Sequence, residues 1–301
     1  MVLITGANGD LGLRLLRSLT VRNCVARAAV RSERAAETVR TFMGRPCDLV
    51  VVDYGKTESL ARAMEGCDAV VHLVGTIRGT RRNPYSRSHE DVIEALVEAA
   101  LRSEKPRVIL ASILGADSES PNGCLASRGR CDDTLLGSGL PGLVLRVPMV
   151  LSPGGPTAGA LYARASGRAV WLGDGSSVEQ PLDARDFVDA ATAAIARETP
   201  LVGSFDLVGP EDLTYYELVK RAAALLATRP KPIHIPKALA LGLAGIATRL
   251  LPDPPVTRDM LDLFLHDDRS NPEVACRALE IELRDLDDSL RFALARKASQ
   301  S

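Results

Sequence analysis

The amino-acid sequence predicts an α/β fold, a doubly wound parallel sheet with a smaller C-terminal region, on three observations. Short β-branched runs alternate with longer segments of helical period. A glycine-rich turn follows the first of these runs, and after about residue 150 the alternation gives way to Gly/Pro loops. We therefore expect one domain over residues 1–150 and a second region over 151–301, with segment 182–208 returning to the sheet.

Each strand and helix of the first half has its own local signal. Proline precedes the fifth and sixth apolar runs, at Pro106 and Pro141, and separates the units. The expected strands are Val2–Thr5, Val25–Val30, Asp48–Val52, Ala69–Leu73, Val108–Ser112 and Leu143–Val147. The expected helices between them are Leu11–Leu19, Ala35–Phe42, Thr57–Met64 and His89–Arg102.

Composition and charge exclude several classes of protein. A formal net charge of −1 gives no general attraction for nucleic acid. The four histidines are scattered and form no zinc spacing with the six cysteines, so no metal site is expected. The N-terminus enters an apolar strand directly, without a signal peptide, which indicates a cytoplasmic protein. The longest apolar run, Ala238–Leu251, is too short to span a bilayer, so no transmembrane segment is expected.

The most specific motif is TGANGDLG, which follows the first strand and opens the first helix. Gly6 permits a tight turn, Gly9 lets a pyrophosphate approach the backbone, and Gly12 lets the helix pack closely on the strand. The helix N-terminus then offers free N–H groups to phosphates. The motif predicts a Rossmann-type dinucleotide-binding domain over residues 1–150, with residues 151–301 on the substrate side.

The spacing of this motif resembles the extended or atypical branch of the short-chain dehydrogenase/reductases, which includes proteins similar to NAD-dependent epimerases and dehydratases. The stretches VVHLVG, LRVPMVLSPGG, GDGSSVEQPLDARDFVDA and GPEDLTYYELV resemble later motifs of that branch, and the resemblance covers about 270 residues. It is strongest to the atypical group that includes the NADPH-binding accessory subunit of respiratory complex I. The resemblance implies the cofactor-binding residues Thr5, Gly6, Asn8, Gly9, Asp10, Leu11, Gly12, Arg31, Asp53, Val74, Gly75, Arg128 and Pro148.

The end of the second strand indicates which dinucleotide is preferred. An NAD site usually has an acidic residue there for the ribose hydroxyls, whereas this chain has Arg31. Because a guanidinium suits a 2′-phosphate, NADP(H) is favoured and NAD(H) stays possible. The alternative is that Arg31 is only a solvated charge. Asp53, after the third strand, resembles the position that contacts adenine, although such aspartates also cap turns.

The catalytic residues of the family are altered in this chain. The resemblance implies a Ser/Tyr/Lys set, in which a phenol exchanges a proton with the substrate and a lysine one turn later assists it. Ser112 matches the serine, but Cys124 and Arg128 stand in the Tyr-x-x-x-Lys frame, followed by Asp132 in place of a glutamate. The literal Tyr216-x-x-x-Lys220 is expected to belong to a helix start capped by Thr214 and Glu217.

Two functions stay open. One is an oxidoreductase that exchanges hydride between NADP(H) and a small-molecule substrate, using water, a substrate hydroxyl or Cys124 for proton transfer. The other is a non-catalytic NADPH-binding structural, assembly or sensor protein that acts through a protein partner. We also expect His72 to be a buried structural histidine. The arginines of segment 75–91 are expected to be solvated, the alternative being an anionic substrate or partner. Ala238–Leu251 is expected to pack against the second region, although it could instead face a lipid or a partner.

Overall fold

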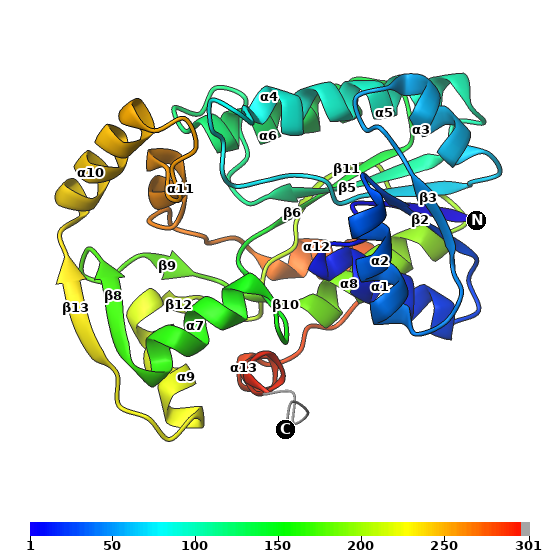
Figure 1. Cartoon of the computed structure of the whole chain (residues 1–301). Helices are drawn as coiled ribbons and strands as arrows, with labels where there is room; N and C mark the ends of the chain where they lie inside the picture. Colours follow the sequence, from blue (N-terminus) through cyan, green and yellow to red (C-terminus); the bar gives the residue numbers. More distant parts are fainter. Residues whose placement is uncertain (296–301) are drawn as a thin grey trace.

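The computed structural model describes residues 1–295, with the side chains at 168–170, 172 and 232 left aside; the expected C-terminal boundary at 301 lies outside this range. Seven parallel strands form the central sheet in the order β11-β6-β5-β4-β1-β2-β3 (Figure 1). They are β1 (Val2–Thr5), β2 (Ala26–Val30), β3 (Asp48–Val51), β4 (Ala69–His72), β5 (Arg107–Ile113), β6 (Gly142–Val147) and β11 (Gly203–Asp206). The prediction of a doubly wound parallel sheet is confirmed.

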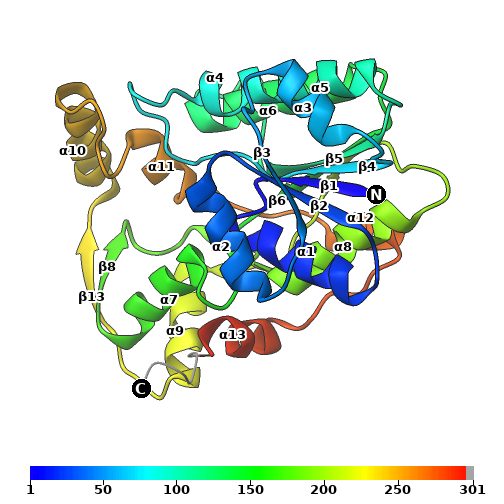
Figure 2. The same cartoon turned by 45° about the vertical axis from the view of Figure 1, so that its right-hand side comes forward.

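Helices cover both faces of this sheet, as Figures 1 and 2 show. One face carries α3 (Thr57–Met64), α5 (Glu90–Arg102) and α6 (Gly123–Leu136), with the single turn α4 (Tyr85–Ser88) beside them. The other carries α1 (Asp10–Val21), α2 (Glu33–Met43), α8 (Ala184–Ala196) and α12 (Pro272–Leu279). Both faces are apolar because the strands are buried on both sides, which explains their continuous β-branched sequence.

The structure follows the expected elements to within a few residues at each end. The fifth strand is longer than expected, Arg107–Ile113, and the first helix extends to Val21. Beyond residue 150 the chain returns to the sheet through α8, and β11 pairs in parallel with β6 from Gly203↔Leu143 to Asp206↔Arg146.

The rest of the C-terminal half forms a smaller region with a hydrophobic core of its own. Three short pairs of strands organise it, β7 with β10, β9 with β12 and β8 with β13. The apolar faces of three helices meet around Leu161, Leu218, Leu290 and the buried Trp171. Its elements are β7 (Val150–Leu151), α7 (Pro156–Ser166), β8 (Arg168–Leu172), β9 (Val178–Glu179), β10 (Leu182–Asp183), β12 (Leu213–Thr214), α9 (Tyr215–Leu225), β13 (Lys231–Ile235), α10 (Lys237–Leu250), α11 (Arg258–Leu263) and α13 (Leu286–Leu294).

The expectation that Ala238–Leu251 packs against the second region holds for one side of the helix only. Helix α10 buries only its small residues Ala240 and Ala244, which pack against Leu261 of α11. Leu241 packs partly against the same cluster, whereas other large side chains of α10 point to solvent, with Leu239 54% and Leu250 75% exposed. Within residues 1–295, no helix has the length and apolar character needed to cross a membrane.

Candidate dinucleotide and catalytic site

The glycine turn between β1 and α1 has the close backbone approaches that a phosphate cradle requires. Gly6 has φ +70°, a conformation that strains any residue with a Cβ. A Cβ at Gly12 would lie 2.7 Å from both the Ala7 Cα and the Gly6 carbonyl oxygen. The amides of Asp10, Leu11 and Gly12 form the first turn of α1, where no earlier helical carbonyl accepts from them. The turn therefore suits the pyrophosphate of a dinucleotide.

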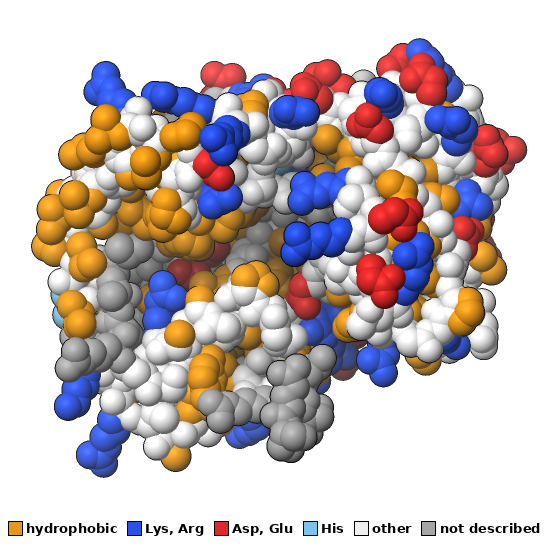
Figure 3. Space-filling model, in the orientation of Figure 1, with side chains coloured by type: hydrophobic (Ala, Val, Ile, Leu, Met, Phe, Trp, Pro, Cys, Tyr) orange, Lys and Arg blue, Asp and Glu red, His pale blue; other side chains and the backbone are white. Residues whose placement is uncertain are grey.

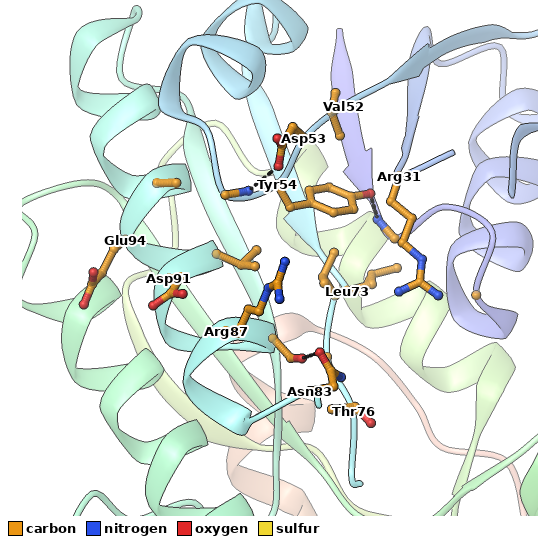
Figure 4. Close-up of a pocket in the computed structure, with 18 of the residues that line it drawn as sticks. Arg31, Val52, Asp53, Tyr54, Leu73, Thr76, Asn83, Arg87, Asp91 and Glu94 are labelled. Carbon is orange, nitrogen blue, oxygen red and sulfur yellow. Dashed lines mark hydrogen bonds between the residues drawn. The ribbon is translucent and has the colours of Figure 1, made fainter. Parts of the chain in front are cut away.

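A cavity of about 1150 Å³ opens on one side of this turn. It is lined by the turn itself, the ends of β2, β3 and β4, and the facing side of α5. Figure 4 shows Arg31 and Tyr54 near one another, with Arg87, Asp91 and Glu94 across the cavity. Its size and its place beyond the carboxyl ends of the strands suit the adenosine half of a dinucleotide.

Tyr54 supports the floor of this cavity. Its hydroxyl accepts a hydrogen bond from the Gly6 amide at 2.8 Å and donates to the Ala29 carbonyl oxygen at 2.7 Å. Burial raises the pKa of Tyr54 to about 12, so the phenol stays protonated and keeps both bonds. The side chain thus ties the glycine turn to β2. The sequence analysis missed this residue.

Five of the expected adenosine-side residues line this cavity: Asn8, Arg31, Asp53, Val74 and Gly75. The side chain of Arg31 has no hydrogen bond or ion pair within residues 1–295, and no carboxylate follows β2 in its place. Asp53 instead caps its own turn, because its carboxylate accepts from the Gly55 amide at 3.2 Å and lies 3.5 Å from the Lys56 ammonium.

A second cavity of about 330 Å³ lies on the other side of the glycine turn. It brings together Ser112 at the end of β5, Cys124 and Arg128 on α6, and Pro148 after β6. Leu11, Gly12, Ile113, Val147 and Val150 complete a mostly apolar wall. Residues distant in sequence thus meet where the nicotinamide half of a dinucleotide would lie.

Arg128 is the principal positive charge of the second cavity. Its guanidinium lies against the backbone of Gly75 and donates a long hydrogen bond, 3.5 Å, to the Ala111 carbonyl oxygen. Burial, and secondly the Arg128 charge, lower the pKa of His72 and of His89 to about 3. Both histidines are therefore neutral, and the Arg128 charge has no carboxylate partner within hydrogen-bonding distance among the described residues.

The Cys124 thiol is buried at the start of α6 and lies 3.8 Å from the Thr76 carbonyl oxygen. Burial raises its pKa to about 11, although the positive charge of Arg128 acts to lower it. Tyr85, on α4, donates from its hydroxyl to the Ile77 carbonyl oxygen at 3.0 Å, and burial raises its pKa to about 12. The Tyr85 phenol therefore stands beside the Cys124 thiol.

Ser112 and Asp132 form a buried pair below the cavity. The Ser112 hydroxyl lies near the Asp132 carboxylate and lowers its pKa, while burial raises it more, but the two atoms lack regular hydrogen-bond geometry. Asp132 accepts from Arg146 of β6 at 2.8 Å. The third residue of the altered Cys-Arg-Asp frame therefore anchors α6 to the sheet.

Thr5 and Asp10 make contacts within the protein. The buried Thr5 hydroxyl lies 2.8 Å from Nδ1 of His72, which confirms the expectation of a structural histidine there, and Thr5 is absent from both cavity linings. Asp10 borders the second cavity, but its carboxylate accepts from Ser152 and from Arg14 at 3.1 Å. It holds the glycine turn to the segment that follows β7.

The literal Tyr-x-x-x-Lys at Tyr216 is not in either cavity lining, and it belongs to a helix start as expected. Thr214 and Glu217 form a complete capping box at the N-terminus of α9. Tyr216 is 46% exposed and packs on Trp171 in the C-terminal region. The expectation for Thr214 and Glu217 is confirmed.

Comparisons with known proteins agree with this geometry. Residues 6–158 match a family of domains described as NAD(P)H-binding. A ceramide reductase of Caulobacter vibrioides is 28% identical over 241 residues, 78% of this chain and 74% of that protein. The 40 kDa subunit of mitochondrial NADH-ubiquinone oxidoreductase of Neurospora crassa is 22% identical over 273 residues, 90% of this chain and 72% of that protein.

Among solved structures, UDP-glucuronic acid 4-epimerase of Bacillus cereus, in complex with UDP-glucuronic acid and NAD, superposes with a TM-score of 0.76. It is 15% identical, and the alignment covers 97% of each chain, so the likeness shows the fold. The family match spans the glycine turn, both cavities and the altered catalytic frame. This chain belongs to the NAD(P)H-binding family, as an atypical member of the short-chain dehydrogenase/reductases.

Proposed function

We propose that the chain is an NADP(H)-dependent oxidoreductase that reduces a carbonyl group on a largely apolar small molecule. The observation that carries the cofactor preference is Arg31, a partnerless guanidinium at the end of β2 in the adenosine-side cavity. A 2′-phosphate supplies the dianion that such a guanidinium binds. In the first turn of α1, Asp10, Leu11 and Gly12 would offer their amides to the pyrophosphate.

The residues of the second cavity favour reduction over oxidation. A bound reduced nicotinamide supplies a hydride to the substrate carbonyl carbon, and the carbonyl oxygen then requires a proton. Cys124, with a pKa near 11, holds that proton at neutral pH, and Tyr85 lies behind it. The thiol gives up its proton and regains it from water. The reverse reaction would need the Cys124 thiolate, which burial disfavours at neutral pH.

Arg128 and Ser112 would position the reactants. The uncompensated Arg128 charge suits the ribose hydroxyls of the nicotinamide half, the role that lysine has in the family. The Ser112 hydroxyl, free of regular hydrogen bonds in the described residues, suits the substrate oxygen. The thiol is shorter than the phenol it replaces, so a water or a substrate hydroxyl would bridge it to that oxygen.

The wall of the second cavity supports an apolar substrate. Ile77, Ile113, Val147 and Val150 line it, and its charged lining residues are Arg128 and Asp10. The relative from Caulobacter vibrioides is named as a reductase of ceramide, a long-chain lipid. We therefore propose a carbonyl compound with an alkyl chain as the substrate class, and the cytoplasm as the compartment.

The Arg31→Ala variant tests the cofactor proposal. We expect the dissociation constant of NADPH to rise at least tenfold, with that of NADH changed less than twofold, because only NADPH carries the 2′-phosphate. Arg17→Ala, an exposed arginine on α1 outside both cavities, is the matched control. Equal losses for the two dinucleotides in Arg31→Ala would refute the NADP(H) preference.

A second candidate function is a non-catalytic NADPH-binding protein that acts through a protein partner. The observation that favours it is the lining of the second cavity, which contains the Cys124 thiol and Arg128 but no tyrosine or lysine. The relative from Neurospora crassa is named as a subunit of a larger assembly. Thermal stabilisation by NADPH, no single-turnover loss of NADPH absorbance with any long-chain ketone or enone, and a co-purifying partner would favour this function.

A further inference from the structure

Helix α10 presents an apolar face that folding of the chain does not use. Leu239, Leu243, Ile246 and Leu250 recur at the spacing that places side chains on one face of a helix. They are 54%, 58%, 58% and 75% exposed. The inward face consists of Ala240, Ala244 and the partly buried Leu241, so most of the large side chains of α10 lie on the outer face.

The apolar face continues into the segments that follow α10. Leu251, Val256 and Phe264 are 47%, 40% and 44% exposed. Figure 3 shows hydrophobic side chains gathered over the lobe that holds α10 and α11, with Lys and Arg side chains along its upper edge. We call these three residues together with the four of α10 the α10 face.

An arginine-rich segment is attached to the end of this face. The Arg81 guanidinium donates to the Arg249 carbonyl oxygen at 3.0 Å, and Arg78 forms an ion pair with Asp253 at 3.5 Å. Arg82 is exposed beside them. These contacts join residues 78–82, which follow β4, to the C-terminal end of α10, although the two segments lie about 170 residues apart.

Two segments beside the α10 face, residues 229–251 and 76–87, carry only basic charges. Residues 229–251 contain Arg229, Lys231, Lys237 and Arg249 and no acidic residue. Residues 76–87 contain four arginines and no acidic residue. Residues 251–264, which hold the rest of the α10 face, contain Asp253, Asp259 and Asp262, and Asp253 is paired with Arg78.

We propose that the α10 face docks on the surface of an anionic lipid bilayer. The leucines would enter the boundary between headgroups and acyl chains, and the basic residues would meet the lipid phosphates. A second copy bound through the same face would bring these basic residues against one another, which disfavours a symmetric dimer. Because α10 has 14 residues and lies along the lobe, the protein would bind on the membrane without crossing it.

The test is flotation of the full-length protein with vesicles of phosphatidylcholine alone or with 30% phosphatidylglycerol added. We expect binding to the anionic vesicles, at least tenfold weaker binding to the neutral ones, and loss of binding as salt rises from about 0.15 to 0.5 M. The double variant L243E/L250E should reduce the partition coefficient at least tenfold. NADPH binding and the melting temperature of this variant should be unchanged, because neither leucine is buried.

The matched control is V21E/V202E, which places the same charges at residues 75% and 57% exposed on other surfaces. It should bind vesicles as the unchanged protein does. Failure of the unchanged protein to float with anionic vesicles, or equal flotation of L243E/L250E, would overturn the proposal. A vesicle-free dimer that L243E/L250E dissociates would assign the face to a second copy instead. These outcomes are independent of NADPH binding and turnover.

Discussion

The two cavities on either side of the glycine turn differ in size and in the kinds of group that line them. The adenosine-side cavity is wide and polar. It is lined by the backbone of the glycine turn, by Tyr54 and by Arg31, whose side chain has no partner within residues 1–295. The second cavity is about a third as large and mostly apolar, and burial raises the pKa of the Cys124 thiol in its lining to about 11. The glycine turn thus serves dinucleotide binding, whereas the second cavity presents a thiol, a hydroxyl and an arginine.

The largest effect is expected from closing the cradle that both cavities share. Gly12→Ala places a Cβ 2.7 Å from backbone atoms that cannot give way, so α1 must move away from β1. We expect the dissociation constant of NADPH, measured by calorimetry, to rise at least 100-fold. Gly159→Ala on α7, where a Cβ meets nothing within 4 Å, is the control. Unchanged binding in a folded Gly12→Ala variant would contradict the cradle.

The next largest effect is expected at Arg128, and it tests the second cavity independently of the first. Arg128→Ala removes the positive charge from the second cavity, and Arg128→Lys restores the residue type of the family. We expect the alanine variant to weaken NADPH about tenfold or more and the lysine variant to recover most of that loss. Affinity for an adenosine 2′,5′-bisphosphate fragment, which fills only the first cavity, should not change. A loss of fragment binding equal to that of NADPH would place Arg128 in the wrong cavity.

A third effect should appear in turnover without a change in binding. Cys124→Ala removes the thiol that faces the cavity, so we expect kcat for a reducible ketone to fall about tenfold or more, with the NADPH dissociation constant unchanged. Tyr85→Phe removes only the hydroxyl behind it, and its effect should be smaller, about two- to fivefold. A larger loss in Tyr85→Phe than in Cys124→Ala would make the phenol the proton donor.

The smallest effect is on pH dependence. Because the pKa values of His72 and His89 are lowered to about 3 in the folded state, their imidazole NMR signals should not titrate between pH 8 and pH 5. The unfolded chain binds these protons near pH 6.5, so stability is complete above that pH and is lost as pH falls toward 3. At pH 5 the loss is about 2 kcal/mol for each histidine. A titration midpoint near 6 would show that water reaches the two imidazoles and would contradict their burial.

The features that sequence alone predicted are those encoded in local patterns. The spacing of Gly6, Gly9 and Gly12 after an apolar strand specifies a turn and a helix start within eight residues. The capping box at Thr214 is equally local. Segments with the residue period of a strand or of a helix therefore predicted the strands of the sheet and most of its flanking helices. The predicted bounds differ from the observed ones by a few residues.

The features that sequence alone missed depend on contacts between distant residues. Tyr54 meets Gly6 across 48 residues, and Tyr85 reaches Cys124 from α4. The only signal for Tyr54 was its place directly after Asp53. For α10 the composition was misleading, because an apolar helix usually packs inward, but the spacing of its four large residues already separated them from Ala240 and Ala244.

The most direct measurement is calorimetric titration of the unmodified protein with NADPH and, separately, with NADH. Both cavities, the glycine turn and Arg31 together predict one dinucleotide per chain, with NADPH bound at least tenfold more tightly than NADH. Tighter binding of NADH would contradict the role of Arg31. Absence of heat from either dinucleotide would contradict the central claim that this fold holds a pyridine dinucleotide.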